Sequence, residues 1–207
     1  MADQPAHPAV PDVVRFLDDV RAAIEAIESV DDGGRTLPVT AGLARAIDLI
    51  VGAARSGRKL MFVGNGASAA IASHQAVDYW KTGGIRATAF NDPAQLTCLG
   101  NDYGYAHVFA KAVEMFADPG DVLVAVSSSG RSENILRAAG AAREKACRVI
   151  TLSGFERANP LRGLGDVNFY VPSKTYGHVE VTHVALLHGM LDAIVATYGR
   201  PPTKERS

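Results

Sequence analysis

Two stretches of this sequence decide its fold and locate its site: Phe62-Val63-Gly64-Asn65-Gly66-Ala67-Ser68 and Val126-Ser127-Ser128-Ser129-Gly130-Arg131-Ser132. In each, a short apolar run gives way directly to a helical pattern. Small residues, hydroxyl groups and unpaired backbone N–H groups therefore collect at the start of a helix, where the helix dipole favours an anion. The two stretches predict a binding site for the phosphate of a small metabolite.

The alternation of apolar runs with helical stretches continues outward from both motifs. Strands are expected at 59–63, 87–90, 122–126, 148–152 and 167–171, and helices at 68–81, 105–116, 133–146, 158–164 and 179–198. The runs are continuously apolar rather than alternating, which indicates strands buried on both faces. We therefore predict an α/β fold with a doubly wound, five-stranded parallel sheet flanked by helices. Ligands of such sheets bind at the carboxyl ends of the strands, where both motifs fall.

Two further helices are expected before this alternation. Apolar residues recur at helical spacing over 12–29, the Asp-Asp-Gly-Gly run at 31–34 ends that helix, and a second helix extends from about Thr40 to Arg55. These helices form an N-terminal extension of a single domain over 12–199. The polar, proline-rich residues 1–11 are expected to be a disordered tail, and residues 200–207 a frayed one.

Composition excludes several classes of function. The 207 residues carry a formal net charge of -1, which offers no basic footprint for nucleic acid or an anionic membrane. No apolar run reaches the roughly 20 residues that span a bilayer, and the N-terminus lacks the pattern of a signal peptide. Cys98 and Cys147 are too few for a disulfide framework and are expected to be buried thiols. We expect a cytoplasmic protein that binds neither nucleic acid nor a membrane.

Histidines and carboxylates on two expected helices form a second candidate site. His74 and Asp78 lie four residues apart and share a helix face. Glu180 and His188 lie eight apart, about 80° around the last helix. If the helices meet, these four side chains could hold one divalent metal ion, zinc or another first-row ion. Alternatively the histidines are ordinary packed or interface residues, as we expect for His107, His178 and His183.

The order of these motifs resembles a known family. Five motifs carry the resemblance, from first to last Gly64-Asn65-Gly66-Ala67-Ser68, His74 with Asp78, Gly100-Asn101-Asp102-Tyr103-Gly104-Tyr105, Ser127-Ser128-Ser129-Gly130-Arg131-Ser132, and Glu180 with His188. They resemble the sugar isomerase (SIS) domain family, and within it the sedoheptulose 7-phosphate isomerases, also called phosphoheptose isomerases. The resemblance covers nearly the whole chain. It implies a homotetramer with active sites at subunit interfaces and a zinc-assisted aldose–ketose interconversion.

The resemblance also implies a role for each motif. The phosphate would lie on four serines, Ser127, Ser128, Ser129 and Ser132. The sugar would contact Asn65, Gly66, Ser68, Asp102 and Glu180. One zinc ion per subunit would be held by His74, Asp78, Glu180 and His188. Among these, Asp78 would be the general base and His188 the general acid.

Three features depart from the family pattern. Asp78 occupies the position of the family's usual glutamate and is one methylene shorter, so the base must lie closer to the substrate or act through water. Glu180 stands for the usual glutamine; its added negative charge should strengthen metal binding and weaken the metal as a Lewis acid. Residues 79–86 replace a longer, arginine-bearing stretch that helps to surround the sugar, so the length and stereochemistry of the sugar stay open.

We therefore expect a metal-dependent ketose–aldose isomerase of a phosphorylated sugar. The first candidate reaction converts sedoheptulose 7-phosphate to D-glycero-D-manno-heptose 7-phosphate through an enediol. One alternative is an isomerase of another long-chain phosphosugar, such as an octulose 8-phosphate. The other is a non-catalytic SIS module that binds a sugar phosphate or a protein partner. Stoichiometric metal in the purified protein would favour an enzyme over that module.

Overall fold

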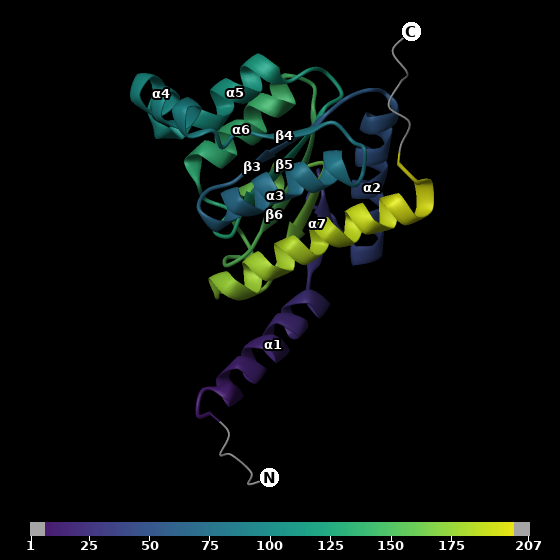
Figure 1. The fold of residues 1–207 in the computed structure, drawn as a ribbon, viewed down its shortest axis with the longest axis vertical. Coiled ribbons are helices and arrows are strands. Elements are labelled where there is room, and N and C mark those ends of the chain that lie inside the picture. The colour runs from purple at the N-terminus through teal and green to yellow at the C-terminus, as the bar shows by residue number, and fades with distance from the viewer. Residues whose placement is uncertain (1–6, 201–207) are drawn as a thin grey trace.

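A seven-stranded sheet forms the centre of the molecule (Figure 1). The computed structural model describes residues 7–200, so residues 1–6 of the tail predicted over 1–11, and residues 201–207 of that predicted over 200–207, lie outside the described residues. The strands are β1 (Glu28–Asp31), β2 (Thr36–Leu37), β3 (Leu60–Val63), β4 (Ala87–Ala89), β5 (Val122–Ser127), β6 (Arg148–Ser153) and β7 (Val167–Tyr170). Their spatial order is β2-β1-β7-β6-β5-β3-β4. Strands β3 to β7 are parallel, as predicted.

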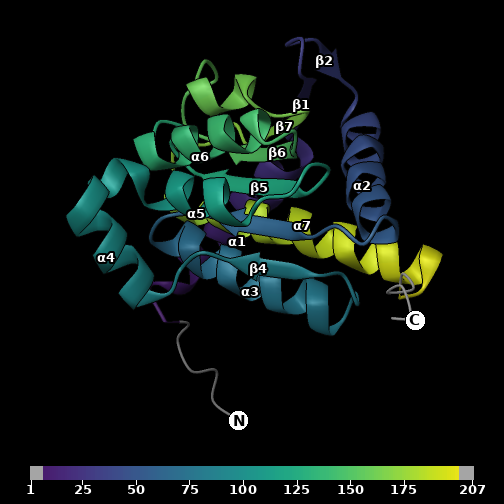
Figure 2. The ribbon, with the colours of Figure 1, turned by 90° about the horizontal axis from the view of Figure 1, so that it is seen from above.

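Helices cover both faces of the sheet (Figure 2). One face is covered by α2 (Val39–Arg55), α3 (Ala67–Lys81) and α7 (Tyr176–Tyr198), the other by α4 (Pro93–Tyr103), α5 (Val108–Phe116) and α6 (Glu133–Glu144). Successive strand residues point to opposite faces, so Phe62 joins the first core while Met61 and Val63 join the second. The doubly wound α/β fold is confirmed.

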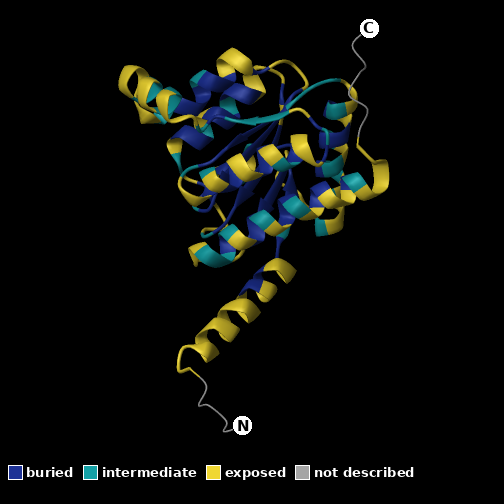
Figure 3. Ribbon diagram, viewed as in Figure 1, coloured by how far each residue is buried: buried dark blue, intermediate teal, exposed yellow. Residues whose placement is uncertain are grey.

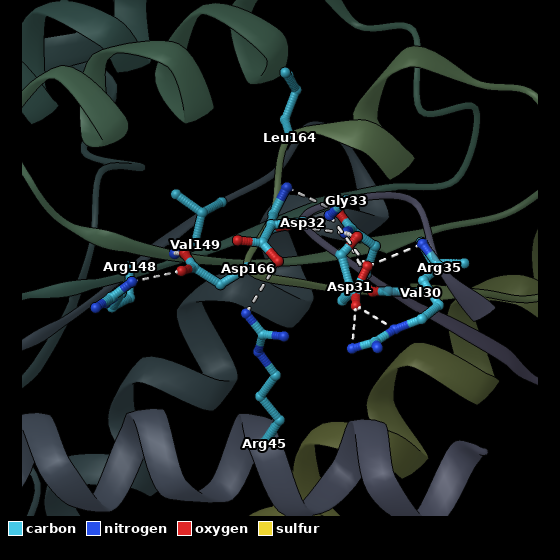
Figure 4. Close-up of polar contacts among 12 residues, drawn as sticks. Val30, Asp31, Asp32, Gly33, Arg35, Arg45, Arg148, Val149, Leu164 and Asp166 are labelled. Atoms are coloured by element: carbon cyan, nitrogen blue, oxygen red, sulfur yellow. Dashed lines mark hydrogen bonds and ion pairs between the residues drawn. The ribbon is translucent and has the colours of Figure 1, made fainter. Parts of the chain in front are cut away.

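Strands β1 and β2 were not predicted and extend the sheet beyond β7 by antiparallel pairing. The turn between them depends on Asp31, whose carboxylate accepts hydrogen bonds from the backbone N–H groups of Gly33 (3.1 Å) and Arg35 (2.9 Å). These bonds, that from Arg35 first, hold the pKa of Asp31 below its ordinary value. Figure 4 shows this turn beside two ion pairs, Asp32 with Arg45 and Arg148 with Asp166.

A helix after β4 was also missed. α4 begins at Asp92, whose side chain accepts a hydrogen bond from the backbone N–H of Gln95 at 2.9 Å, and Pro93 occupies the first helical position. The short 3₁₀ turn η1 (Tyr105–His107) follows, so α5 begins three residues later than expected. The helix predicted at 158–164 is a second 3₁₀ turn, η2 (Pro160–Gly163).

The first helix, α1 (Val10–Glu25), projects from the body of the molecule (Figure 1). It begins inside the predicted tail and ends before residues 26–29, which were expected to be helical. Figure 3 shows that most of it is exposed, and its apolar residues Val13, Val14 and Leu17 are more than half exposed. An exposed apolar surface of this kind marks an interaction site.

Helix α7 is the only described helix long and apolar enough to cross a membrane by length and composition. Its most apolar window has a mean hydropathy of 1.4, and 44% of that window is buried inside the domain. Leu187 and Met190 pack into the core beneath the sheet. Core helices of globular domains pass the same test, and α7 packs as one.

One histidine of α7 is fully buried and should make stability depend on pH. Burial lowers the pKa of His183 to about 4, although its Nε2 lies 3.2 Å from the Ser153 carbonyl. The unfolded chain takes up a proton near pH 6.5 that the folded chain refuses until about pH 4. The free energy of unfolding should therefore decrease as the pH is lowered, by about 2 kcal/mol between pH 7.5 and pH 5.

Urea unfolding of wild type and His183→Gln at both pH values tests this prediction. The glutamine side chain does not titrate, so the variant should lose less stability on acidification than wild type. The difference between the two proteins removes the contribution of other groups, such as Asp31. Equal losses in both proteins would contradict the prediction.

Candidate active site

The two sequence motifs meet at the carboxyl ends of β3 and β5. Strand β3 lies between β4 and β5, so the connections that follow β3 and β5 run in opposite directions along the sheet. Such a switch point opens a crevice between the two loops. A cavity of about 250 Å³ occupies the crevice. It is lined by Asn65, Gly66, Ala67, Ser68, Ser127, Ser128, Ser129, Ser132, Tyr176 and Glu180. All the predicted substrate-binding residues except Asp102 are among them.

The first loop relies on two glycines. Gly66 is the N-cap of α3 and has a φ of 55°, in the left-handed region that favours glycine. A Cβ atom on Gly64 would collide with the backbone of Ser68, so only glycine lets β3 end this close to the first turn of the helix. Ser68 is not the cap; it is buried within the first turn and lines the cavity.

Asn65 ties the first loop to α6 across the crevice. Its Nδ2 donates to Asn134 Oδ1 at 2.9 Å, and its Oδ1 accepts from Asn134 Nδ2 at 2.9 Å and from the Tyr105 hydroxyl at 3.0 Å. The carbonyl oxygen is thus doubly engaged, and one amide hydrogen remains to contact a ligand. Asn134 was not predicted as a site residue, and Tyr105 was named only within a motif, because only the fold brings both to Asn65.

The serine loop presents hydroxyl groups at the start of α6. Ser127 Oγ donates to Ser132 Oγ at 3.4 Å, and Ser129 Oγ accepts from the Arg131 backbone N–H at 3.2 Å. Ser128 Oγ is buried with no hydrogen-bond partner in the described part of the chain. Ser132 is the N-cap of α6, yet no side chain among residues 7–200 caps this helix. An unpartnered buried hydroxyl and an uncapped helix N-terminus suit a bound anion.

A second polar group lies farther along α3 and α7, which run side by side (Figure 1). His74 Nε2 lies 3.2 Å from His188 Nε2 and 3.2 Å from Asp78 Oδ2, and His188 Nδ1 lies 3.7 Å from the same carboxylate. The possible ligand atoms of the three side chains all lie within 4.8 Å of one another. The Tyr79 hydroxyl, which donates to the Leu187 carbonyl at 3.1 Å, fastens the two helices here. The structure therefore brings together three of the four predicted metal ligands.

This donor set fits a catalytic metal site. Two imidazoles and one carboxylate are ligands that zinc accepts, with a fourth position left for water or substrate. His74 Nε2 lies 3.2 Å from both His188 Nε2 and Asp78 Oδ2, close to the separation of two ligand atoms that share a zinc ion with bonds of about 2 Å, and all three ligand atoms lie within 4.8 Å of one another. His74 is exposed, while Asp78 and His188 are half-buried, so the group is open on one side.

Glu180 is outside the His74–Asp78–His188 group found among the described residues. It precedes His188 by eight residues, about 12 Å along the helix axis at 1.5 Å per residue. Instead it lines the serine cavity, where desolvation by burial raises its pKa. Asp102 is exposed on α4, where Cys98 Sγ lies 3.6 Å from its Oδ2. Cys98 was expected to be buried but is exposed.

Sequence analysis also missed Tyr176, which lines the cavity from the first residue of α7. The available signal was its position. It follows β7, a parallel strand whose carboxyl end lies at the same edge of the sheet as the two motifs. Any side chain shortly after such a strand is a candidate for the crevice.

Comparisons with known proteins agree with this architecture. Residues 16–154 match the family model of the SIS domain. A phosphoheptose isomerase of Helicobacter hepaticus is 36% identical over 169 residues, 78% of this chain and 85% of the relative. One from a Bradyrhizobium species is 43% identical over 164 residues, 75% and 81% of the two chains. The structure of phosphoheptose isomerase GmhA from Neisseria gonorrhoeae aligns with a TM-score of 0.77 and 33% identity over 89% of this chain and 97% of that one. The chain belongs to the SIS domain family and, within it, to the phosphoheptose isomerases.

Proposed function

We propose that this chain is a ketose–aldose isomerase that converts sedoheptulose 7-phosphate to D-glycero-D-manno-heptose 7-phosphate. One observation carries the proposal: α3 and α7, which together hold the His/Asp/His group, both begin at the serine-lined cavity. Glu180, in the cavity, and His188 are separated by about 12 Å along the axis of α7. That separation suits a long open-chain sugar whose phosphate lies at one end and whose reacting carbons lie at the other. The names of the curated relatives support the same substrate.

In this proposal the serine loop binds the phosphate. Its four serines and the N–H groups at the start of α6 would surround the phosphate oxygens. Asn65, Gly66, Ser68 and Glu180 would contact the sugar within the same cavity. Asp102, exposed on α4, would contact a sugar bound by a neighbouring subunit.

The proton transfers are assigned to Asp78 and His188. Asp78 takes the proton from C1 of the ketose and delivers it to C2, while the hydroxyl proton passes from O1 to O2, so that the enediol collapses to the aldose. His188 assists ring opening as a general acid. His74, Asp78 and His188 would hold a zinc ion, which would supply polarisation of the carbonyl and of the developing enediolate. The two oxygens of Asp78 allow one to contact the metal and the other to accept the proton.

We further propose a cytoplasmic homotetramer. The exposed apolar residues of α1, a helix that is mostly exposed in Figure 3, support subunit contacts. An apolar groove of about 300 Å³, lined in part by Ile24 of α1, supports them too. That groove is lined chiefly by Ile24, Ile27, Leu43, Ile47, Leu186 and Met190. Light scattering of the purified protein measures the number of subunits directly.

The proposed reaction is tested by incubating the zinc-loaded protein with sedoheptulose 7-phosphate in D₂O and recording NMR spectra of the products. We expect an aldoheptose 7-phosphate that carries deuterium at C2. An octulose 8-phosphate and a pentulose 5-phosphate, tested in parallel, show whether chain length is selected. Binding of these compounds without turnover would favour the non-catalytic SIS module.

Ser129→Ala should weaken phosphosugar binding. Loss of a hydroxyl that bonds a charged group costs about 1–3 kcal/mol, so KM should rise by about 5-fold or more while kcat changes little. Steady-state kinetics measure both constants, and Ser56→Ala, an exposed serine at the end of α2, serves as the control. If Ser127→Ala, Ser129→Ala and Ser132→Ala all leave KM unchanged, the serine loop does not bind the phosphate.

A further inference from the structure

Tyr176 supplies the aromatic surface of the substrate cavity. Among the described residues that line this cavity, the others are glycine, alanine, serine, asparagine and glutamate. The Tyr176 side chain stands at the start of α7 and is 62% exposed, so its ring is available to a ligand. A sugar phosphate carries C–H groups along its carbon chain as well as hydroxyls, and sites for such ligands combine an aromatic wall with placed polar groups.

Phe155 supports the Tyr176 ring from the end of β6. The two ring centroids lie 4.8 Å apart at an interplanar angle of 86°, an edge-to-face contact. Phe155 in turn packs against a small apolar cluster that includes Val179 of α7 and Ala23 of α1. The exposed ring is thus fixed on one side by packed residues and left open on the other.

The backbone of Phe155 is held in a conformation that phenylalanine rarely adopts. Its φ is 59°, in the left-handed region where a Cβ atom is disfavoured. Two hydrogen bonds hold it there: its N–H donates to the Ser173 carbonyl at 3.0 Å, and its carbonyl accepts from the Tyr170 hydroxyl at 3.1 Å. Glycine would meet the backbone requirement more easily, and backbone strain in a residue that contacts the lining of a cavity is typical of functional positions.

Tyr176 lies one helical turn before Glu180 on α7, and both side chains line the serine cavity. Tyr176 and Glu180 are four residues apart and share a helix face, whereas His188 lies eight residues beyond Glu180 and about 80° around the helix. The first two line the serine cavity, and the third belongs to the His/Asp/His group. A sugar whose phosphate is bound by the serine loop would therefore have the carbon atoms next to the phosphate within the cavity that Tyr176 lines.

We propose that Tyr176 is a specificity-determining residue whose ring packs against the carbon chain next to the phosphate, and that Phe155 positions that ring. The inference rests on the proposed function, because it assumes a phosphosugar bound by the serine loop. It assigns the recognition of inorganic phosphate to the serines alone and the recognition of the sugar chain in part to Tyr176.

Kinetics of Tyr176→Ala test the proposal, with Tyr198→Ala, at the far end of the same helix, as the matched control. For sedoheptulose 7-phosphate we expect KM to rise about tenfold and kcat to stay within about threefold, the effect of a lost aromatic contact on uniform binding. Inhibition by inorganic phosphate should not change. Tyr176→Phe should retain most of the wild-type KM, since it keeps the ring. An unchanged KM in Tyr176→Ala, or equal weakening of phosphate inhibition, would overturn the proposal.

The same comparison by calorimetry separates this proposal from the proposed reaction. If wild type converts no phosphosugar, the isomerase assignment fails, but binding of sedoheptulose 7-phosphate and of inorganic phosphate can still be measured. Tyr176→Ala should then weaken the binding of sedoheptulose 7-phosphate and leave the binding of inorganic phosphate unchanged. Equal affinities of wild type and Tyr176→Ala for sedoheptulose 7-phosphate would refute the role of Tyr176 whatever the enzyme does.

Phe155→Gly tests the positioning role. The substitution removes the ring and at the same time relieves the left-handed backbone. We expect KM for sedoheptulose 7-phosphate to rise, with kcat and phosphate inhibition unchanged, while Phe155→Tyr, which restores a ring, brings KM back toward wild type. If Phe155→Gly alters thermal stability but leaves KM at the wild-type value, Phe155 has only a structural role.

Discussion

Asp78→Asn should lower kcat by about 100-fold or more, the usual scale for removal of a general base. Asparagine keeps the size of the side chain and an oxygen that can contact a metal, but it cannot take a proton from C1. The carboxylate that it replaces is half-buried between two imidazoles, 3.2 Å from His74 Nε2 and 3.7 Å from His188 Nδ1. Steady-state turnover of sedoheptulose 7-phosphate measures the effect. Deuterium incorporation from D₂O should fall in parallel, because both report the same proton transfer.

The control for this substitution is Asp48→Asn, an exposed carboxylate on α2 away from the His/Asp/His group. Zinc content must be measured for both variants, so that loss of the base is not confused with loss of the metal. If Asp78→Asn turns over normally, Glu180 is the next candidate for the base, because it is the other carboxylate of the set. If Glu180→Gln is also fully active, the enediol mechanism at this site is wrong.

The parallel sheet could be predicted because its signals are local. Runs such as Leu60–Val63 are short, apolar throughout and followed by glycine, which is typical of a strand buried on both faces. The strand β1 gives no such signal. Its residues Ser29 and Asp31 are polar, and they are buried only because the segment pairs with β7, more than a hundred residues away. The cap of α4 at Asp92, followed by Pro93, was by contrast a readable signal that the apolar pattern obscured.

The site was predictable to the extent that its residues are neighbours in the sequence. The glycine and serine loops each follow one strand and open one helix, so chain order alone assigns them to the crevice. Asn134 contacts Asn65 only because the fold brings α6 beside the first loop, while Tyr176 lines the cavity from the start of α7, a position that its place after β7 indicated. Helical spacing put His74 beside Asp78, and the contact of α3 with α7 supplied His188. Spacing did not decide whether Glu180 joins His188 at the metal. The rotation of about 80° between the two residues permits a shared centre, but their separation of about 12 Å along the helix axis opposes one.

Removal of either histidine of the group should abolish metal binding. His74→Ala and His188→Ala each leave only two of the three donors that lie within 4.8 Å, and two donors are too few for a zinc site of the catalytic kind. We expect the zinc content to fall from one ion per subunit to background and kcat to drop by about 100-fold or more. Treatment of wild type with a chelator should have the same effect on activity, and added zinc should reverse it. His107→Ala, in η1, is the matched control.

The variant Glu180→Gln then tests whether Glu180 is the fourth ligand of the metal. If the loaded protein keeps the arrangement described here, Glu180 stays in the serine cavity, and the variant should bind zinc as wild type does while KM for the phosphosugar changes. If Glu180 instead moves to the metal, removal of its charge should weaken zinc binding, because a carboxylate attracts the ion more strongly than an amide does. Competition with a zinc indicator measures the affinity in both proteins. Full activity in metal-free wild type would contradict the metal site as a whole and leave Asp78 and His188 as an acid–base pair.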